Sequence, residues 1–327
     1  MKIIKVKLEN ELLNIDSVNC LEISIAYCLN KIGIDYKQYF ILYLKCLQSY
    51  KIKKYSGLNV KYPVEIHYFL KDILKKLNVE IIQNKNLCNS SIFIKNSIND
   101  NDFVFISGNL KELYYSKYYK KEDSRHVFLI NGYDEGRNIY YIIDNIQNQN
   151  SRSEYSQFSI KKSMLEKMIS SYQTAFQTFF ECKIKMICPQ LNKKKILKEV
   201  LSHICQSNTE LWENDFIDDI KNIIDGNSRE NECVEECFIR CIKHKYLFYK
   251  TLLNIIKNNF PNIINYEIFE KTYEELIQTW KSISNICLFK LYKKEHFDIT
   301  IKVREAIMIE NYMKEILKHI ILEIGGE

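Results

Sequence analysis

The stretch from residue 126 to residue 144 reads HVFLINGYDEGRNIYYIID, and it decides the fold of the first half of this chain. Residues 126–130 and 139–144 are rich in β-branched and aromatic side chains, which favour strands. Between them, residues 131–138 supply the Gly, Asp and Asn of a turn. The stretch therefore predicts two antiparallel strands joined as a hairpin.

Two residues at the ends of this hairpin suit an active site. If the turn is centred on Glu135, His126 and Asp144 lie directly opposite each other, with their side chains on one face. A carboxylate in that place holds the tautomer and the orientation of an imidazole that serves a nucleophile. A shift of one residue in the register would move the two side chains to opposite faces, so the prediction depends on the turn.

The candidate nucleophile is Cys20, which opens a predicted helix. Residues 16–19 include N-cap residues and directly precede an apolar-periodic stretch over 21–32, a pattern typical of a helix of about three turns. The N–H groups and the dipole of a first helical turn stabilise a thiolate. An imidazole alongside adds to this effect, because thiolate and imidazolium stabilise each other. Cys20, His126 and Asp144 are therefore the predicted catalytic residues.

The composition changes near Pro189 and predicts two domains. Before it, β-like runs alternate with helical patterns, and after it almost the whole chain has helical periodicity. With 8 Gly and 3 Pro, the chain has too few turn-forming residues for an all-β sandwich or an α/β barrel. We expect an α+β domain with a small antiparallel sheet over residues 1–190 and a helical domain over residues 191–327. Further strands are expected at 3–8, 79–82, 103–106 and within 175–188, and further helices at 37–49, 64–77, 159–170, 192–206, 210–225, 230–257, 267–286 and 300–323.

Charge and cysteine content place the protein in a broad class. The 47 basic and 41 acidic residues leave a net charge of +6, spread along the chain. Such a charge suits an acidic protein partner and lacks the concentrated basic face of a nucleic-acid binder. The chain has no apolar run long enough for a signal peptide or a membrane span, so we expect a soluble cytoplasmic protein. Its 11 irregularly spaced cysteines are then expected to be thiols rather than disulfides.

Three motifs together resemble a known family. A Cys that opens a helix near the N-terminus, then HVFLINGYD, then IIDN about eighteen residues after the His, resemble the papain-like fold in its C39-peptidase-like branch. The chain is most similar to the butirosin-biosynthesis BtrH-like acyltransferases, which include the amide-forming enzyme of the closthioamide pathway. The similarity covers roughly residues 10–185, with a looser match in the helical tail.

The resemblance implies a role for each site residue. Cys20 would be the nucleophile, His126 the general base and acid, and Asp144 the residue that orients the imidazole. Papain-like enzymes place an amide side chain six positions before the cysteine, where it forms an oxyanion hole with the cysteine's own N–H. Here that position is Asn14 rather than Gln, one methylene shorter, and the alternative for Asn14 is a turn residue or a helix cap.

The resemblance also implies an activity and its partners. An acyl or peptidyl group would pass from a carrier-protein thioester, on a phosphopantetheine arm, to Cys20, and a small amine would capture it as an amide in specialised-metabolite biosynthesis. No cofactor bound by the chain itself and no metal are expected. The alternatives are a cysteine peptidase or amidase of the same fold and a non-catalytic binding scaffold. Leu21-Glu22 after the cysteine and Asn145 after Asp144 replace the small residue and the Pro that the peptidase branch often has, and so weaken the protease alternative. The helical domain is expected to shape the cleft or to mediate association, for example as a homodimer.

Two further motifs have simpler explanations. Cys233, Cys237, Cys241 and His244 share one predicted helix, which puts the outer two about 16 Å apart, too far to surround one zinc ion. A buried seam is the expected role. Residues 117–121, KYYKK, mix basic and aromatic residues just before the His, and we expect a loop beside the active site or a solvated face, with recruitment of a carrier-protein arm as a further alternative. No nucleotide-binding motif of the GxxxxGK[ST] or GxGxxG type is present.

Overall fold

The computed structural model describes residues 1–6, 20–49, 65–84, 86–145, 155–187, 193–206, 234–293 and 298–325. The chain forms two compact units. A sheet unit comprises Met1–Tyr36 and Asn78–Gln190, and a helical unit comprises Lys37–Leu77 and Leu191–Glu327. The break after residue 190 falls where the composition changes. The segment Lys37–Leu77 differs from the expected division, because it belongs to the helical unit rather than to the domain over residues 1–190.

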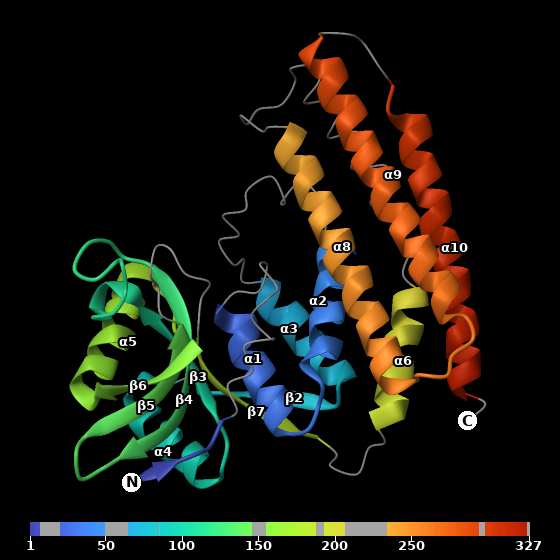
Figure 1. Cartoon of the computed structure of the whole chain (residues 1–327). Helices are drawn as coiled ribbons and strands as arrows, with labels where there is room; N and C mark the ends of the chain where they lie inside the picture. The colour runs from blue at the N-terminus through green and yellow to red at the C-terminus, as the bar shows by residue number, and fades with distance from the viewer. Residues whose placement is uncertain are drawn as a thin grey trace. The chain divides into compact units, whose positions relative to one another are not determined.

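An antiparallel sheet forms the centre of the sheet unit (Figure 1). Its strands follow the order β2-β7-β3-β4-β5-β6, and β1 pairs with β4. The strands are β1 (Lys2–Ile3), β2 (Val79–Gln83), β3 (Val104–Asn109), β4 (Arg125–Asp134), β5 (Ile139–Asn145), β6 (Tyr155–Lys161) and β7 (Glu181–Met186). The mixture of helices with one antiparallel sheet agrees with the expected α+β class.

Three α-helices pack on this sheet, α1 (Cys20–Lys31), α4 (Ser90–Asn99) and α5 (Lys162–Phe176), and short 3-10 turns lie at η3 (Leu87–Asn89) and η4 (Leu110–Glu112). Helix α1 lies against β4, β3 and β7, whereas α5 lies mainly against β3. The apolar residues of the contact layer, such as Ile25, Leu29 and Phe105, are fully buried. Burial of this layer is the main force that holds α1 on the sheet.

Two elements of the sheet unit were not foreseen from the pattern. Helix α4 lies in a stretch for which the sequence predicts no element. The helix predicted at 159–170 begins instead at residue 162, and the residues before it belong to strand β6. Strand β6 lies at one edge of the sheet. Buried residues alternate with more exposed ones along it, and few of its side chains are apolar. Such a strand depends on its neighbour β5 more than on its own sequence.

The β4–β5 hairpin is confirmed, but the expected register is wrong. Asp134 pairs with Ile139, so the turn lies between Gly136 and Arg137 rather than at Glu135. His126 lies opposite Gly108 of β3, not opposite Asp144.

A β-bulge at Asn131 changes the pairing partway along the hairpin. On the turn side Gly132 pairs with Tyr141, and beyond the bulge Ile130 pairs with Ile142. Without the extra residue, Asp144 would lie opposite Leu129, on the other face from His126. With it, Asp144 falls opposite Phe128, two residues from His126 and on the same face.

The N-terminal strand secures this bulge. The main-chain oxygen of Asn131 accepts a hydrogen bond from the Ile4 N–H at 2.8 Å, and its side-chain Nδ2 donates to the Ile4 oxygen at 3.0 Å. Asn131 is fully buried. Gly132 lets β1 come close, because a Cβ there would lie 2.6 Å from the Lys2 main-chain oxygen.

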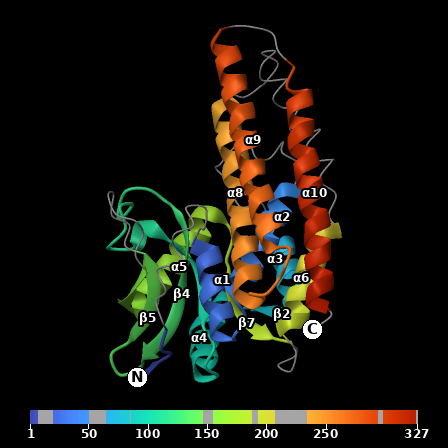
Figure 2. The same ribbon diagram turned by 45° about the vertical axis from the view of Figure 1, so that its right-hand side comes forward.

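The helical unit consists of long helices (Figures 1 and 2). Its described helices are α2 (Tyr36–Ser49), α3 (Glu65–Lys76), α6 (Lys193–Gln206), α8 (Val234–Asn259), α9 (Tyr266–Tyr292) and α10 (Thr300–Gly325), of which α2 begins at the last residue of the sheet unit. Helix α3 packs against α6, which explains why its segment belongs to this unit. The expected helix at 210–225 lies outside the described residues. None of the helices in the described part of the chain has the length and apolar character needed to cross a membrane.

Candidate active site

Cys20 is the first residue of α1, as expected, and its side chain is half-buried. The main-chain N–H of Val127 donates a hydrogen bond to Cys20 Sγ at 3.3 Å. This amide lies on β4 next to His126, so α1 and β4 meet at the sulfur. An N–H aimed at sulfur favours the thiolate over the thiol. The capping residues expected at 16–19 and Asn14 lie outside the described residues.

His126 and Asp144 come together despite the changed register. His126 Nε2 lies 2.7 Å from Asp144 Oδ1, and the two side chains are 6% and 1% exposed. Because Nε2 faces the carboxylate, Nδ1 is the ring nitrogen that remains for Cys20. The three predicted residues therefore form one continuous arrangement from three elements, α1, β4 and β5.

The electrostatic setting keeps His126 protonated. Burial opposes its charge, but the Asp144 carboxylate, Cys20 and hydrogen bonds to both outweigh burial and hold the pKa of His126 well above its ordinary value of 6.5. An imidazolium beside a sulfur at a helix N-terminus stabilises the thiolate. The protonated ring and the first turn of α1 therefore meet at the Cys20 sulfur.

Tyr115 is a site residue that sequence reasoning missed. Its hydroxyl donates a hydrogen bond to Asp144 Oδ2 at 2.6 Å. Burial and the adjacent Asp144 carboxylate raise the pKa of Tyr115, so the phenol keeps its proton. The only sequence signal was the cluster of tyrosines shortly before His126, which does not distinguish Tyr115 from its neighbours.

Two other cysteines of the described residues, Cys28 and Cys88, lie in different settings. None of the cysteines whose side chains the structure describes forms a disulfide. Cys28, eight residues further along α1, is fully buried, and burial raises its pKa, which makes it a poor nucleophile. Cys88 is exposed. Cys233 and the side chains of Cys237, Cys241 and His244 lie outside the part of the chain that the structure describes, so the predicted seam stays a prediction.

The basic and aromatic segment at 117–121 lies in the loop between η4 and β4. The ammonium groups of Lys117 and Lys120 lie over the rings of Tyr118 and Tyr119, at 4.9 and 5.1 Å from their centres. The lysines are exposed. These contacts are local to the loop, so the segment presents cationic side chains to solvent next to the site.

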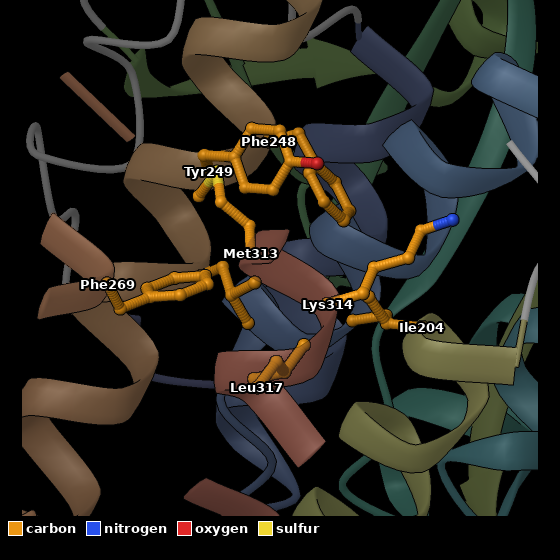
Figure 3. A pocket seen from close by; sticks show the side chains of 8 residues that line it. Ile204, Phe248, Tyr249, Phe269, Met313, Lys314 and Leu317 are labelled. Carbon is orange, nitrogen blue, oxygen red and sulfur yellow. The ribbon is translucent and has the colours of Figure 1, made fainter. Parts of the chain in front are cut away.

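The helical unit contains a small cavity (Figure 3). Its volume is about 10 Å³, the space of roughly one water molecule. The lining side chains come from α6, α8, α9 and α10, and are Ile204, Phe248, Tyr249, Leu252, Phe269, Met313, Lys314 and Leu317. A hollow of this size is a packing gap rather than a site for an organic ligand.

The chemistry available at Cys20, His126 and Asp144 is nucleophilic attack by sulfur with proton transfer through an imidazole. Models of known protein families were compared with the chain and none matches, and no curated protein matches it either.

Proposed function

We propose that this chain is a papain-like, cysteine-dependent acyltransferase that forms amides from carrier-protein thioesters in specialised-metabolite biosynthesis. The observation that carries the proposal is His126, buried between Cys20 and Asp144 with its Nε2 2.7 Å from Asp144 Oδ1. This is the relation that an acyl-transferring cysteine requires: a thiolate, a proton carrier and an acid that orients the carrier.

In the first half-reaction, the Cys20 thiolate attacks the carbonyl carbon of the thioester. The tetrahedral intermediate collapses, the bond to the carrier's sulfur breaks, and His126 gives its proton to the departing thiolate. The products are an acyl-Cys20 thioester, a neutral imidazole and a free carrier thiol. One thioester replaces another, so the exchange is close to neutral in free energy.

In the second half-reaction, an amine attacks the acyl-Cys20 carbonyl. Neutral His126 accepts the proton that the amine nitrogen loses, the carbon–sulfur bond breaks, and the amide leaves. The thiolate–imidazolium pair is restored. Capture by an amine requires that water stay away from the acyl-enzyme. The burial of His126 and Asp144, at 6% and 1% exposure, supports this requirement on one side of the sulfur.

The charge of the chain supports an acidic macromolecular donor. The net charge of +6 and the exposed lysines of the loop that precedes His126 would attract a negatively charged carrier protein.

Mass spectrometry with simple pantetheine thioesters (acetyl, hexanoyl and glycyl) tests the proposal. The intact protein should gain the mass of one acyl group, and peptide mapping should place that group on Cys20. The Cys20→Ser variant should not form the thioester adduct, whereas Cys88→Ser, which removes an exposed thiol outside the site, should acylate normally.

An added amine then distinguishes the activities. Amide release from acyl-Cys20 supports the transferase, and release of free acid alone would show a hydrolase of the same geometry. If Cys20 stays unmodified with every thioester, the acyl-enzyme mechanism is wrong and a binding role becomes the better explanation.

A further inference from the structure

The loop that carries Tyr115 is closed at its base. Residues 110–124 leave the sheet after β3 and return at β4. The Leu110 N–H donates to the Ser124 oxygen at 3.0 Å, and the Lys120 N–H donates to the Lys111 oxygen at 2.9 Å. The ends are therefore adjacent, as in an Ω-loop.

Asn109, the last residue of β3, organises this base. Its Oδ1 accepts hydrogen bonds from the Lys111 N–H at 3.2 Å and the Ser124 N–H at 3.1 Å. Its Nδ2 donates to Asp123 Oδ1 at 2.8 Å and to Ser171 Oγ at 2.9 Å. Asn109 is fully buried. A side chain with four such contacts leaves the loop little freedom at its base.

Within the loop, Tyr115 is held on two sides. Its ring stacks on Phe158 of β6, with ring centres 4.3 Å apart and planes 14° from parallel. Its hydroxyl donates to Asp144 Oδ2, while Oδ1 of the same carboxylate contacts His126. The two oxygens of Asp144 are thus divided between the loop and the imidazole.

We propose that Tyr115 is a positioning residue for the Cys20–His126–Asp144 site, and that the loop closed by Asn109 exists in part to hold its hydroxyl on Asp144. The proposal rests on the proposed function only for its effect on catalysis. A carboxylate can turn about its Cβ–Cγ bond, and a donor on Oδ2 keeps Oδ1 directed at the ring. Tyr115 itself touches neither the sulfur nor the acyl group in this scheme.

The hydroxyl also moderates the charge that acts on His126. Among the described residues, the charged or titratable groups that act on this ring are Asp144 and Cys20, and those that act on the Tyr115 hydroxyl are Asp144, Tyr114 and Tyr155. A phenol that donates to a carboxylate disperses part of its negative charge. Removal of the phenol leaves that charge to act on the imidazolium, which favours the protonated ring.

The test is Tyr115→Phe, which keeps the stacked ring and removes only the hydroxyl. Titration of His126 by NMR should show a pKa increase of about one pH unit. The rate of acyl-Cys20 formation from a pantetheine thioester should fall roughly tenfold, because the carboxylate is no longer held. Tyr118→Phe is the matched control: this tyrosine belongs to the same loop and its ring faces Lys117, so both quantities should stay at the parent's values.

A second variant tests whether the stacking of Tyr115 on Phe158 positions the hydroxyl on Asp144. Phe158→Leu removes the stacking surface but leaves the hydroxyl, so it should raise the His126 pKa by less than Tyr115→Phe does. In the Tyr115→Phe background the same substitution should have no further effect on this pKa. If Phe158→Leu shifts the His126 pKa in that background as much as in the parent, Phe158 does not act through Tyr115. That result would overturn the role of the stacking contact.

The outcomes separate this proposal from the proposed function. If the parent chain forms no acyl-Cys20 but Tyr115→Phe shifts the His126 pKa, the positioning role of Tyr115 stands and the acyltransferase chemistry is rejected. If the parent chain is acylated but Tyr115→Phe leaves both the His126 pKa and the rate of acyl-Cys20 formation unchanged, the positioning role of Tyr115 is rejected.

Discussion

At the scale of single residues, the candidate site depends on which nitrogen of His126 faces which neighbour. Nε2 contacts Asp144 and leaves Nδ1 for Cys20. Burial alone would disfavour the charged ring, and the adjacent carboxylate reverses that preference. The protonation state of His126 therefore depends on Asp144, a residue on another strand, together with Cys20.

The substitution Asp144→Asn should lower the pKa of His126. Without the carboxylate, burial dominates, and the pKa should fall by more than about one pH unit. The pH at which the His126 ring loses its charge should move down with it. NMR titration of the ring measures the shift, and Glu135→Gln, at the exposed turn of the same hairpin, should leave it unchanged.

Protein stability should respond with a definite sign. A histidine whose folded-state pKa is raised stabilises the fold fully below its ordinary value of 6.5, and this contribution is lost as the pH rises through the raised value. The stability difference between the parent and Asp144→Asn should therefore be full below pH 6.5 and should narrow as the pH rises from there through the raised pKa of His126. A difference that widens with pH would contradict the assigned charge state.

At the scale of elements, the bulge at Asn131 decides whether His126 and Asp144 share a face. The short strand β1 pairs with Gly132 through Ile3, and the next residue, Ile4, contacts the bulge. The pairing of Lys2 and Ile3 with β4 thus influences the geometry of a site at the other end of the hairpin. The close approach of β1 is the sensitive point, because the two atoms nearest to an added Cβ at Gly132 are backbone atoms that cannot turn away.

Gly132→Ala should destabilise the sheet unit by about 1–3 kcal/mol. The added methyl would lie 2.6 Å from the Lys2 oxygen and 2.9 Å from Ile3 Cα, so β1 must move. Urea unfolding measures the change. Gly136→Ala, in the turn of the same hairpin, is the control, since its added methyl meets its nearest atom at 3.6 Å. Equal stabilities for the two variants would show that β1 does not press on Gly132.

At the scale of the whole molecule, the chain passes between its two units three times, after residues 36, 77 and 190. The helical unit contains a buried ion pair, with Lys245 Nζ 2.5 Å from Glu310 Oε1 and both side chains 3% exposed. The Lys245 ammonium also lies over the ring of Trp280, 5.0 Å from its centre.

Lys245→Met should destabilise the helical unit by roughly 3–5 kcal/mol, because it leaves the Glu310 charge buried without its cation. The double variant Lys245→Met/Glu310→Leu should recover most of that loss. Chemical unfolding followed by circular dichroism measures both. Lys302→Met, which breaks an exposed pair with Glu305, should change stability by less than about 1 kcal/mol. A double variant as unstable as the single one would show that the pair itself, rather than the isolated charge, is essential.

Local patterns in the sequence were enough to predict the hairpin, the helix that begins at Cys20 and most of the helical unit. Each of these depends on periodicity or on turn residues within a short stretch. Cys20 was singled out by its place at a helix start, whereas His126 and Asp144 were singled out by a strand register that is wrong. The bulge at Asn131 nevertheless brings these two side chains onto one face. Helix α4 and strand β6 carry weaker patterns and were missed.

The position of the turn, the bulge at Asn131 and the two hydrogen bonds to the site from Val127 and Tyr115 were decided by tertiary structure alone. Asn131 and its partner Ile4 are 127 positions apart, and Val127 and Cys20 are 107 apart. Contacts at such separations depend on how whole elements pack, and no short pattern encodes them. Local patterns therefore pointed to the candidate residues, whereas their common orientation arose only when α1, β1, β5 and the loop before β4 came together around β4.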